Sequence, residues 1–377
     1  MLSAAANASG DYSSAFGTGA IAEGIYSTAI GTGFRDDGSR NNIAGARDAR
    51  ATAMGYQARA SGDSSSAYGY HSTALSPESS AYGASSIAEG LGSSAYGAGS
   101  IADAVLSSAI GANSAATGLS AIALGTGFLD DGSGNNFAGA HADYATAAGY
   151  QARASGENSL ALGAQAAASA EGAVAVGWGA QSSGSNAIAI GTGAVATGSV
   201  AVGAGAQAAN GGAAFGDAAV ATGTNSAALG PGATATAANS VAIGSGSMAT
   251  QANTVSVGAA GAERRITNVA PGIAATDAAT VGQLQGFAGG LQGQIEETRE
   301  ESRQGVAAAM AMTAAPMPSA PGKVSWTLNA SAFRSEFGVG GSLAYRFDTP
   351  FPLAVTGGYA YGGGSAHGGR VGLQGEF

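Results

Sequence analysis

The sequence predicts a mainly β protein that is built in three successive parts and assembled from several copies of the chain. Three observations support this prediction. The phrase Ser-x-Ala-x-Gly recurs every 14 residues over most of the chain, a heptad pattern follows the repeats, and residues 323–377 alternate between apolar and small or polar residues. These patterns are typical of a β-solenoid, a coiled coil and long amphipathic strands, respectively.

The composition excludes several classes of protein. Gly makes up 65 of the 377 residues, only 10% are charged, and the formal net charge is −10. A nucleic-acid-binding protein would be basic, so nucleic acid is not an expected partner. The chain has no Cys and therefore has neither disulfides nor thiolate zinc sites. No apolar run reaches 18 residues, and Met1 to Asp11 does not resemble a signal peptide, so an exported protein would have its signal peptide missing from this sequence.

Residues 1–258 form the repeat region. A period of 14 residues is too short for a helical repeat but fits one solenoid turn with two short strands and two tight corners rich in Gly, Ser, Asn and Thr. Because neighbouring strands lie about 4.8 Å apart, about seventeen turns predict a rod of about 80 Å. The repeat glycines are Gly17, Gly31, Gly55, Gly69, Gly83, Gly97, Gly111, Gly125, Gly149, Gly163, Gly177, Gly191, Gly203, Gly216, Gly230, Gly244 and Gly258.

Two turns of the repeat are ten residues longer than the others. They contain near-copies at residues 33–42 and 127–136, which lie 94 residues apart and indicate a duplicated block. The Asp pairs at 36–37 and 130–131 raise the question of a cation-binding loop. The spaced ligands and closing Glu of an EF-hand are absent, so a polar excursion loop is the favoured interpretation.

Two positions in each repeat define the two faces of its strand. The residue before each repeat Gly is bulky and apolar, and the residue before that is Ala in nearly every turn. Neither face of the strand therefore has the charged or long polar residues that are typical of a solvent-exposed face. We therefore expect the bulky face to fill the coil and the Ala face to pack against further copies; a monomeric solenoid with an Ala-rich outer face is the alternative. The ladder Tyr68, Tyr82 and Tyr96 is expected to be stacked packing rather than a carbohydrate platform.

The repeat stops at Gly258, and residues 259–280 form a neck before a predicted helix. Thr276 and Asp277 are good helix-start residues. Apolar or small residues then recur at spacings of three and four, which predicts a short coiled coil with a thin, Ala-rich continuation over residues 281–315. The heptad positions are Val281, Leu284, Ala288, Leu291, Ile295, Thr298 and Ser302.

Residues 322–377 predict four strands of about ten residues with aromatic residues near their ends, which is typical of outer-membrane strands. Four strands cannot close a barrel, and open sheet edges are not tolerated in lipid. Three chains supply twelve strands, an even number that closes around a narrow lumen. The same stoichiometry would build a trimeric stalk and pack the Ala faces of three heads, so the sequence predicts a homotrimer.

The order of these parts resembles a trimeric autotransporter adhesin of the YadA-like type. The resemblance rests on the neck stretches Arg264-Arg-Ile-Thr-Asn-Val-Ala-Pro-Gly272 and Thr276-Asp-Ala…Val281-Gly-Gln-Leu284, and on the helix, strands and terminal residue of the anchor. It implies a trimeric left-handed parallel β-roll head with the 14-residue repeat, a short trimeric coiled-coil stalk and a twelve-stranded trimeric transmembrane β-barrel anchor with four strands per chain. Gly305 matches the small residue that keeps the lumen passable during export, and Phe377 looks like the signal read by the outer-membrane assembly machinery.

The resemblance also implies a function and a location. The chain would be a self-exporting adhesin of type V secretion, anchored in outer-membrane lipid with its head at the cell surface, where it attaches to host cells or extracellular matrix. Collagen is a candidate ligand, because one stretch resembles the family's collagen-binding phrase; weaker copies begin at Ser185 and Ser199. Its residues are Asn239, Ser240, Val241, Ala242, Ile243, Gly244 and Ser247. Every solenoid turn needs similar packing residues, so a non-adhesive structural or shielding protein, for autoaggregation or serum resistance, is the alternative.

No enzymatic chemistry is predicted. His71, His141 and His367 are far apart, and no His, Asp or Glu cluster has metal-ligand spacing. The Gly-x-Gly pairs do not form a strand-GxGxxG-helix unit, so nucleotide binding is not expected. A solenoid enzyme acting on polysaccharide would need paired acids on one face, where the repeats place Ala, Ser and Gly. We therefore expect no catalytic residue, cofactor or metal.

Overall fold

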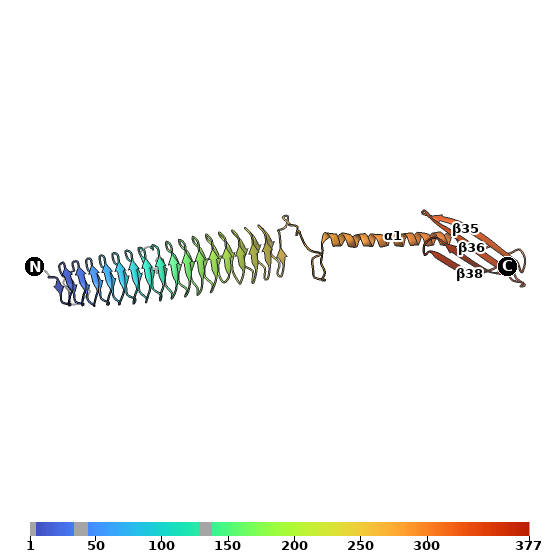
Figure 1. Cartoon of the computed structure of the whole chain (residues 1–377). Helices are drawn as coiled ribbons and strands as arrows, with labels where there is room; N and C mark the ends of the chain where they lie inside the picture. Colours follow the sequence, from blue (N-terminus) through green and yellow to red (C-terminus); the bar gives the residue numbers. More distant parts are fainter. Residues whose placement is uncertain (1–4, 34–43, 128–137, 377) are drawn as a thin grey trace. The chain divides into compact units, whose positions relative to one another are not determined.

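The computed structural model describes residues 5–33, 44–127 and 138–376. The chain divides into two compact units, Met1–Arg265 and Ile266–Phe377. The first unit contains the repeats, and the second contains a long helix and a four-stranded sheet (Figure 1).

The first unit is a parallel β-solenoid in which each turn contributes one strand to each of two sheets (Figure 1). Each strand pairs in parallel with the equivalent strand one turn away, as Ala67, Ala81 and Ala95 do. The predicted solenoid with its 14-residue turn is thus confirmed. The odd-strand sheet consists of β1 (Asn7–Ala8), β3 (Ile21–Ala22), β5 (Gly45–Ala46), β7 (Arg59–Ala60), β9 (Thr73–Ala74), β11 (Ile87–Ala88), β13 (Ile101–Ala102), β15 (Ser114–Ala116), β17 (Ala138–Ala140), β19 (Arg153–Ala154), β21 (Ala167–Ala168), β23 (Gln181–Ser182), β25 (Val195–Ala196), β27 (Gln207–Ala208), β29 (Val220–Ala221), β31 (Thr234–Ala235) and β33 (Met248–Ala249). The even-strand sheet consists of β2 (Ser14–Phe16), β4 (Thr28–Ile30), β6 (Thr52–Met54), β8 (Ser66–Tyr68), β10 (Ser80–Tyr82), β12 (Ser94–Tyr96), β14 (Ser108–Ile110), β16 (Ile122–Leu124), β18 (Thr146–Ala148), β20 (Leu160–Leu162), β22 (Val174–Val176), β24 (Ile188–Ile190), β26 (Val200–Val202), β28 (Ala213–Phe215), β30 (Ala227–Leu229), β32 (Val241–Ile243) and β34 (Val255–Ser256).

Tight corners join the strands, and their backbone explains the regular glycines. Gly69 has a φ of 138°, which L side chains rarely adopt, and a Cβ there would lie only 2.4 Å from the carbonyl oxygen of Gly83 in the next turn. Most corners on both sides also contain a residue in the left-handed conformation, such as Gln57 after Gly55 and Asn239 in the opposite corner, whose φ values are 52° and 53°. Asn tolerates this conformation better than most residues because its short polar side chain bonds locally. The Gly and Asn pattern is therefore dictated by the corners.

The interior of the solenoid consists almost entirely of Ala, which overturns the expectation for the two strand faces. Ala109, Ala175 and Ala242 are completely buried, whereas the bulky residue after each of them lies on the outer face. The tight corners hold the two sheets so close together that only Ala and Ser fit between them. The bulky face, not the Ala face, is therefore the one left for a partner.

Serines complete this narrow core. Ser72, Ser86 and Ser100 are fully buried, and each hydroxyl donates to the carbonyl oxygen three residues earlier, at 3.1, 2.9 and 2.8 Å respectively. The hydroxyl is thus satisfied within its own corner and needs no partner across the core. At these three positions Ser can therefore replace Ala inside the coil at little cost.

Helix α1 (Val281–Ala311) is capped by Thr280 rather than by Thr276 or Asp277. The hydroxyl of Thr280 accepts from the backbone N–H of Gln283, and the Gln283 side chain accepts from the backbone N–H of Thr280. This capping box stabilises the helix start by about 1 kcal/mol. The predicted start at Thr276 and Asp277 is wrong, because the Asp277 carboxylate instead accepts from two backbone N–H groups of the preceding loop.

A four-stranded antiparallel sheet completes the second unit, as predicted: β35 (Val324–Phe333), β36 (Glu336–Arg346), β37 (Leu353–Tyr361) and β38 (His367–Gly375). The strands pair in sequence order, so within the described chain one edge of β35 and one edge of β38 have no partner strand. Small and polar residues face the C-terminal end of α1, while large apolar residues face away from it.

Candidate functional site

A stripe of bulky apolar side chains runs along the outer face of the even-strand sheet. In β24, for example, Ile188 and Ile190 point outward on either side of the buried Ala189. A continuous apolar surface of this kind is typical of a protein interface. We call it the apolar stripe; its exposed members are Phe16, Ile30, Tyr96, Ile110, Ile122, Leu124, Ile190, Phe215, Leu229, Ile243 and Val255.

The predicted ligand-binding residues lie at the end of this stripe, but only some of them are accessible. Asn239 and Ile243 are exposed, and Val241 is half-buried. The Asn239 side-chain amide donates to Oδ1 of Asn253 in the next turn at 3.1 Å. A ligand at this surface could therefore touch Asn239, Ile243 and part of Val241. Three other residues of the phrase are fully buried: Ser240, Ala242 and Ser247.

Arg264 fastens the last corner of the repeat region. Its guanidinium donates to Ser247 Oγ and to the carbonyl oxygen of Val257, both at 2.8 Å, and to the carbonyl oxygen of Ser245 at 2.5 Å. The same group lies against Gly244, where an added Cβ would be 3.3 Å from it. Gly244 and Ser247 therefore support the end of the solenoid. Sequence reasoning missed this role, and its only signal was an arginine placed directly after the last repeat.

Tyrosine side chains form stacks along the outside of the head. The ring centroids of Tyr68, Tyr82 and Tyr96 are 4.7 and 4.9 Å apart, with interplanar angles of 7° and 4°. The expected stacked packing is thus confirmed. Two further pairs of rings also stack: Tyr12 with Tyr26, and Tyr56 with Tyr70, with ring centroids 5.0 and 5.2 Å apart. The sequence analysis missed these pairs, although a tyrosine repeated after 14 residues is a signal for them.

One histidine of the head has a shifted pKa. Burial lowers the pKa of His141, and the nearby charge of Arg153 lowers this pKa further, so the imidazole is neutral at pH 7. Its Nδ1 lies 3.3 Å from Thr117 Oγ1. Among the described residues, no group of three or more His, Asp or Glu side chains could hold a metal ion. The Asp pairs at 36–37 and 130–131 lie outside the described residues.

Two carboxylates near the end of the head fasten loops. The backbone N–H of Gly261 lowers the pKa of Glu263, to which it donates at 2.9 Å. The N–H groups of Ala274 and Ile273 likewise lower the pKa of Asp277. Hydrogen bonds to a charged carboxylate favour the ionised form, so both groups remain charged at neutral pH.

The face of the C-terminal sheet toward α1 is shaped by missing side chains. At Gly338, an added Cβ would lie 2.3 Å from the carbonyl oxygen of Ala307, and at Gly340 it would lie 2.5 Å from that of Ala311. Ala307 and Ala311 are themselves fully buried. Helix and sheet backbones therefore contact each other directly, and only small residues fit between them.

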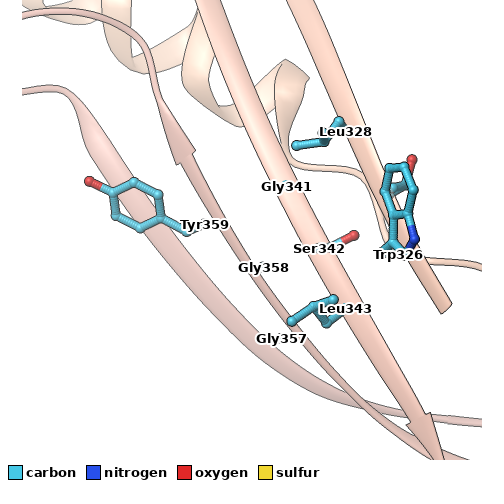
Figure 2. A pocket seen from close by; sticks show the side chains of 9 residues that line it. Trp326, Leu328, Gly341, Ser342, Leu343, Gly357, Gly358 and Tyr359 are labelled. Carbon is cyan, nitrogen blue, oxygen red and sulfur yellow. The ribbon is translucent and has the colours of Figure 1, made fainter. Parts of the chain in front are cut away.

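The opposite face of the sheet carries large apolar side chains. Figure 2 shows Trp326, Leu328, Leu343 and Tyr359 around a shallow hollow of about 580 Å³, where the neighbouring residues are glycines. Trp326, Leu328 and Tyr359 are more than half exposed, at 67%, 75% and 57%. An apolar outer face combined with a small or polar inner face is typical of strands in outer-membrane proteins.

The two residues predicted to act in export differ in what the structure describes. Gly305 lies on α1, and a Cβ added there would have nothing within 4 Å. Phe377 lies outside the described residues. Among the helices of the described residues, none is both long enough and apolar enough to cross a membrane.

Comparison with known proteins places these parts in a family. A model described as the YadA head domain repeat matches residues 8–33, 49–72, 102–127, 140–166, 168–194 and, in overlapping copies, 209–260. A model described as the coiled stalk of trimeric autotransporter adhesin matches residues 265–307. A solved structure, the collagen-binding domain of the Yersinia adhesin YadA, is 23% identical and covers 70% of this chain and 98% of its own, with a TM-score of 0.19. A search among curated proteins found no match.

A repeat head followed by a coiled stalk defines the class of trimeric autotransporter adhesins. Within this class, the chain belongs to the YadA-like family, which confirms the resemblance seen in its neck and repeats.

Proposed function

We propose that this chain is a self-exporting adhesin that assembles as a homotrimer in the outer membrane, displays its head at the cell surface and acts by binding rather than by catalysis. The observation that carries the proposal is the C-terminal sheet, which has an exposed apolar face and, within the described residues, two edge strands without a partner. Lipid suits the apolar face, and strands from further copies suit the open edges.

Three surfaces support assembly from three copies. The apolar stripe of the head is uncovered in a single chain, and so is a row of apolar residues on α1: Val281, Leu284, Phe287, Leu291 and Ile295. A helix with such a row gains most of its stability from partner helices. In a homotrimer, the apolar stripes and helix rows would pack around one axis, and β35 of one copy would pair with β38 of the next to close twelve strands.

The proposed anchor explains the small residues of the second unit. Residues 1–258 would be the head, 259–280 the neck, 281–315 the stalk and lumen helix, and 322–377 the membrane anchor. In the closed assembly, three helix ends share one narrow lumen, so the Ala-rich end of α1 and the absence of a side chain at Gly305 keep the lumen passable during export. Phe377 would be read by the outer-membrane assembly machinery.

The proposed targets are host cells or extracellular matrix, with collagen as the first candidate. The surface available for a ligand at the predicted phrase is Asn239, Ile243 and the exposed part of Val241. Val241 and Ile243 lie on the same outer face as the apolar stripe, so packing between copies competes with ligand binding as their role. This competition favours keeping a second candidate function, a shielding protein that promotes autoaggregation or serum resistance.

The assembly is tested by the mass of the complete chain extracted from outer-membrane fractions with mild detergent. We expect three copies per particle and a band on SDS gels that converts to the single-chain position only after boiling. A folded particle containing one copy would overturn the proposal. Cross-linking in intact cells before extraction excludes assembly in the detergent.

Ligand binding is tested with bacteria that display the complete chain on immobilised collagen, fibronectin and laminin. Asn239→Gly removes the exposed amide but keeps the left-handed corner, and Asn158→Gly makes the same change at the equivalent corner of a distant turn. We expect Asn239→Gly to weaken attachment to collagen about tenfold, as the loss of one good hydrogen-bonding group does. Equal loss in both variants refutes the predicted phrase, and attachment to none of the three proteins favours the shielding function.

A further inference from the structure

The corner that follows each even-numbered strand holds a side chain that points away from the coil. This corner reads Gly, a variable residue, and a residue in the left-handed conformation, as in Gly55-Tyr56-Gln57. Tyr56 and Tyr70 occupy the variable position in successive turns, and their rings stack with centroids 5.2 Å apart and planes 9° apart. The rings of Tyr56 and Tyr70 therefore lie face to face in successive turns, and we infer the same orientation for other rings at this position.

At one place along the solenoid, this corner has an aromatic residue in two turns and a small residue in the turn between them. Tyr150 and Trp178 occupy the variable position two turns apart, and Ala164 occupies it in the turn between. Backbone hydrogen bonds join these successive corners. The N–H of Gln165 donates to the carbonyl oxygen of Tyr150 at 2.8 Å, and the N–H of Gly179 donates to the carbonyl oxygen of Ala164 at 2.9 Å, as the N–H of His71 does to the carbonyl oxygen of Tyr56. Two steps of about 4.8 Å place the backbones of Tyr150 and Trp178 about 10 Å apart. Rings oriented like those of Tyr56 and Tyr70 would therefore leave the space of one ring above Ala164. We call this space the Ala164 slot.

The slot is open to solvent and uncharged. Tyr150 is 40% exposed and Trp178 is 60% exposed. The three corners, 149–151, 163–165 and 177–179, contain no charged residue. Beside the slot, the side-chain amide of Gln165 donates to Oε1 of Gln151 at 3.3 Å, and two amide groups have further donor and acceptor capacity beyond this one bond.

We propose that the Ala164 slot binds one pyranose ring of a neutral saccharide between Tyr150 and Trp178. A chair-shaped sugar presents C–H groups on both faces, so it can stack on two aromatic rings at once. Its equatorial hydroxyls would project past the ring edges toward the amides of Gln151 and Gln165. Aromatic walls with a few placed polar groups are the usual construction of a small-ligand site.

The features of the slot favour a sugar over other guests. An anionic or cationic ligand would find no opposite charge in the three corners. The aromatic side chain of a peptide could enter the same space, but it would form no hydrogen bonds with the side-chain amides of Gln151 and Gln165. The filled stack of Tyr68, Tyr82 and Tyr96 offers no such space, since its middle ring is already present.

The test fills the slot from within the protein. Ala164→Tyr supplies the missing ring and should complete a stack like that of Tyr68, Tyr82 and Tyr96, leaving the fold intact. Ala98→Tyr is the matched control, because Ala98 holds the same corner position between Ala84 and Ala112, where no aromatic neighbours exist. Trp178→Ala removes one wall of the slot.

Binding is measured on the complete chain in detergent, in a Trp326→Phe background that leaves Trp178 as the only tryptophan. The probes are maltose, cellobiose, lactose, mannobiose and chitobiose, titrated against Trp178 fluorescence. We expect at least one of them to give a saturable change, with the affinity at least tenfold weaker in Ala164→Tyr and unchanged in Ala98→Tyr. Trp178→Ala, measured by calorimetry, should weaken binding about tenfold, as the loss of one aromatic stacking partner does.

Three results would overturn the proposal: no response to any of the five saccharides, equal affinity in Ala164→Tyr and the parent chain, or binding of a short tyrosine-rich peptide in place of every sugar. Thermal unfolding of Ala164→Tyr checks that the variant is folded. The outcome does not depend on the phrase at Asn239, which lies several turns away and is probed by its own variants.

Discussion

The head and the C-terminal unit both pack small residues inside and leave large apolar residues outside. In the head, Ala175 is buried while Val176 lies on the outer face. In the C-terminal unit, Gly338 lies against α1 while Trp326 and Leu343 face away. Both surfaces call for a partner, which a homotrimer or a lipid bilayer would provide.

The two units differ in how their backbones are satisfied. Nearly every strand of the head has hydrogen-bonded neighbours on both sides within the same chain, one turn before and one turn after. The C-terminal sheet leaves the outer edges of β35 and β38 unpaired in the described chain. Association of several copies would therefore add buried surface to a head that already has its own hydrogen bonds, whereas in the sheet it would also complete the hydrogen bonding of the edges.

The largest expected effect comes from Gly338→Val, which tests the dependence of the C-terminal unit on close packing. The first atom of the new side chain would lie 2.3 Å from the backbone oxygen of Ala307, and neither backbone can move away easily. We expect the boiling-sensitive band of the assembled protein to disappear from outer-membrane fractions. Gly357→Val is the matched control, because a Cβ at Gly357 meets nothing within 4 Å and the residue lies on the apolar face. Assembly of both variants at normal levels would show that helix and sheet do not need this contact.

A smaller effect is expected from Ala175→Leu, which tests the narrow interior of the head. Overpacking a core without free space costs about 3 kcal/mol, which lowers the unfolding midpoint by about 10 °C in a domain of this size. Val176→Leu adds one methylene on the outer face and should cost less than about 1.5 kcal/mol. Circular dichroism melts of the intact protein measure both. Equal destabilisation would mean that the interior is wider than its Ala lining indicates.

Periodicity alone predicts the two-strand turn, the corners and the four C-terminal strands, because each of these follows from backbone geometry repeated along the chain. The assignment of faces failed for a reason that periodicity does not contain. At Ala109 and Ile110 the pattern shows only that neighbours point in opposite directions, and which of them is inside depends on the distance between two sheets. That distance is set by the tight corners that join the two sheets, and it admits only Ala and Ser.

The candidate site was only partly predictable for a related reason. The phrase from Asn239 to Ser247 is visible in the sequence, but the burial of Ser240 and Ser247 depends on the corner and on an arginine from beyond the repeats. The Ala164 slot is visible only once the stacking of Tyr56 on Tyr70 gives the ring orientation at that corner. The space left by a small residue such as Ala164 cannot be recognised from the sequence until the orientation of the neighbouring side chains is known.

The smallest effect is expected from a change at the end of the head, where the last turn has no following turn to hydrogen-bond with. Arg264 takes over this role with three donated bonds to the last corners. Arg264→Gln should weaken residues 245–258 by about 1–2 kcal/mol, which appears as roughly tenfold faster amide hydrogen exchange in this segment while the middle of the head is unchanged. Arg265→Gln, at the exposed neighbouring position, should leave the exchange as it is. If both variants exchange like the parent chain, the last turn holds itself without a cap, and the head would then depend on no residue outside its repeats.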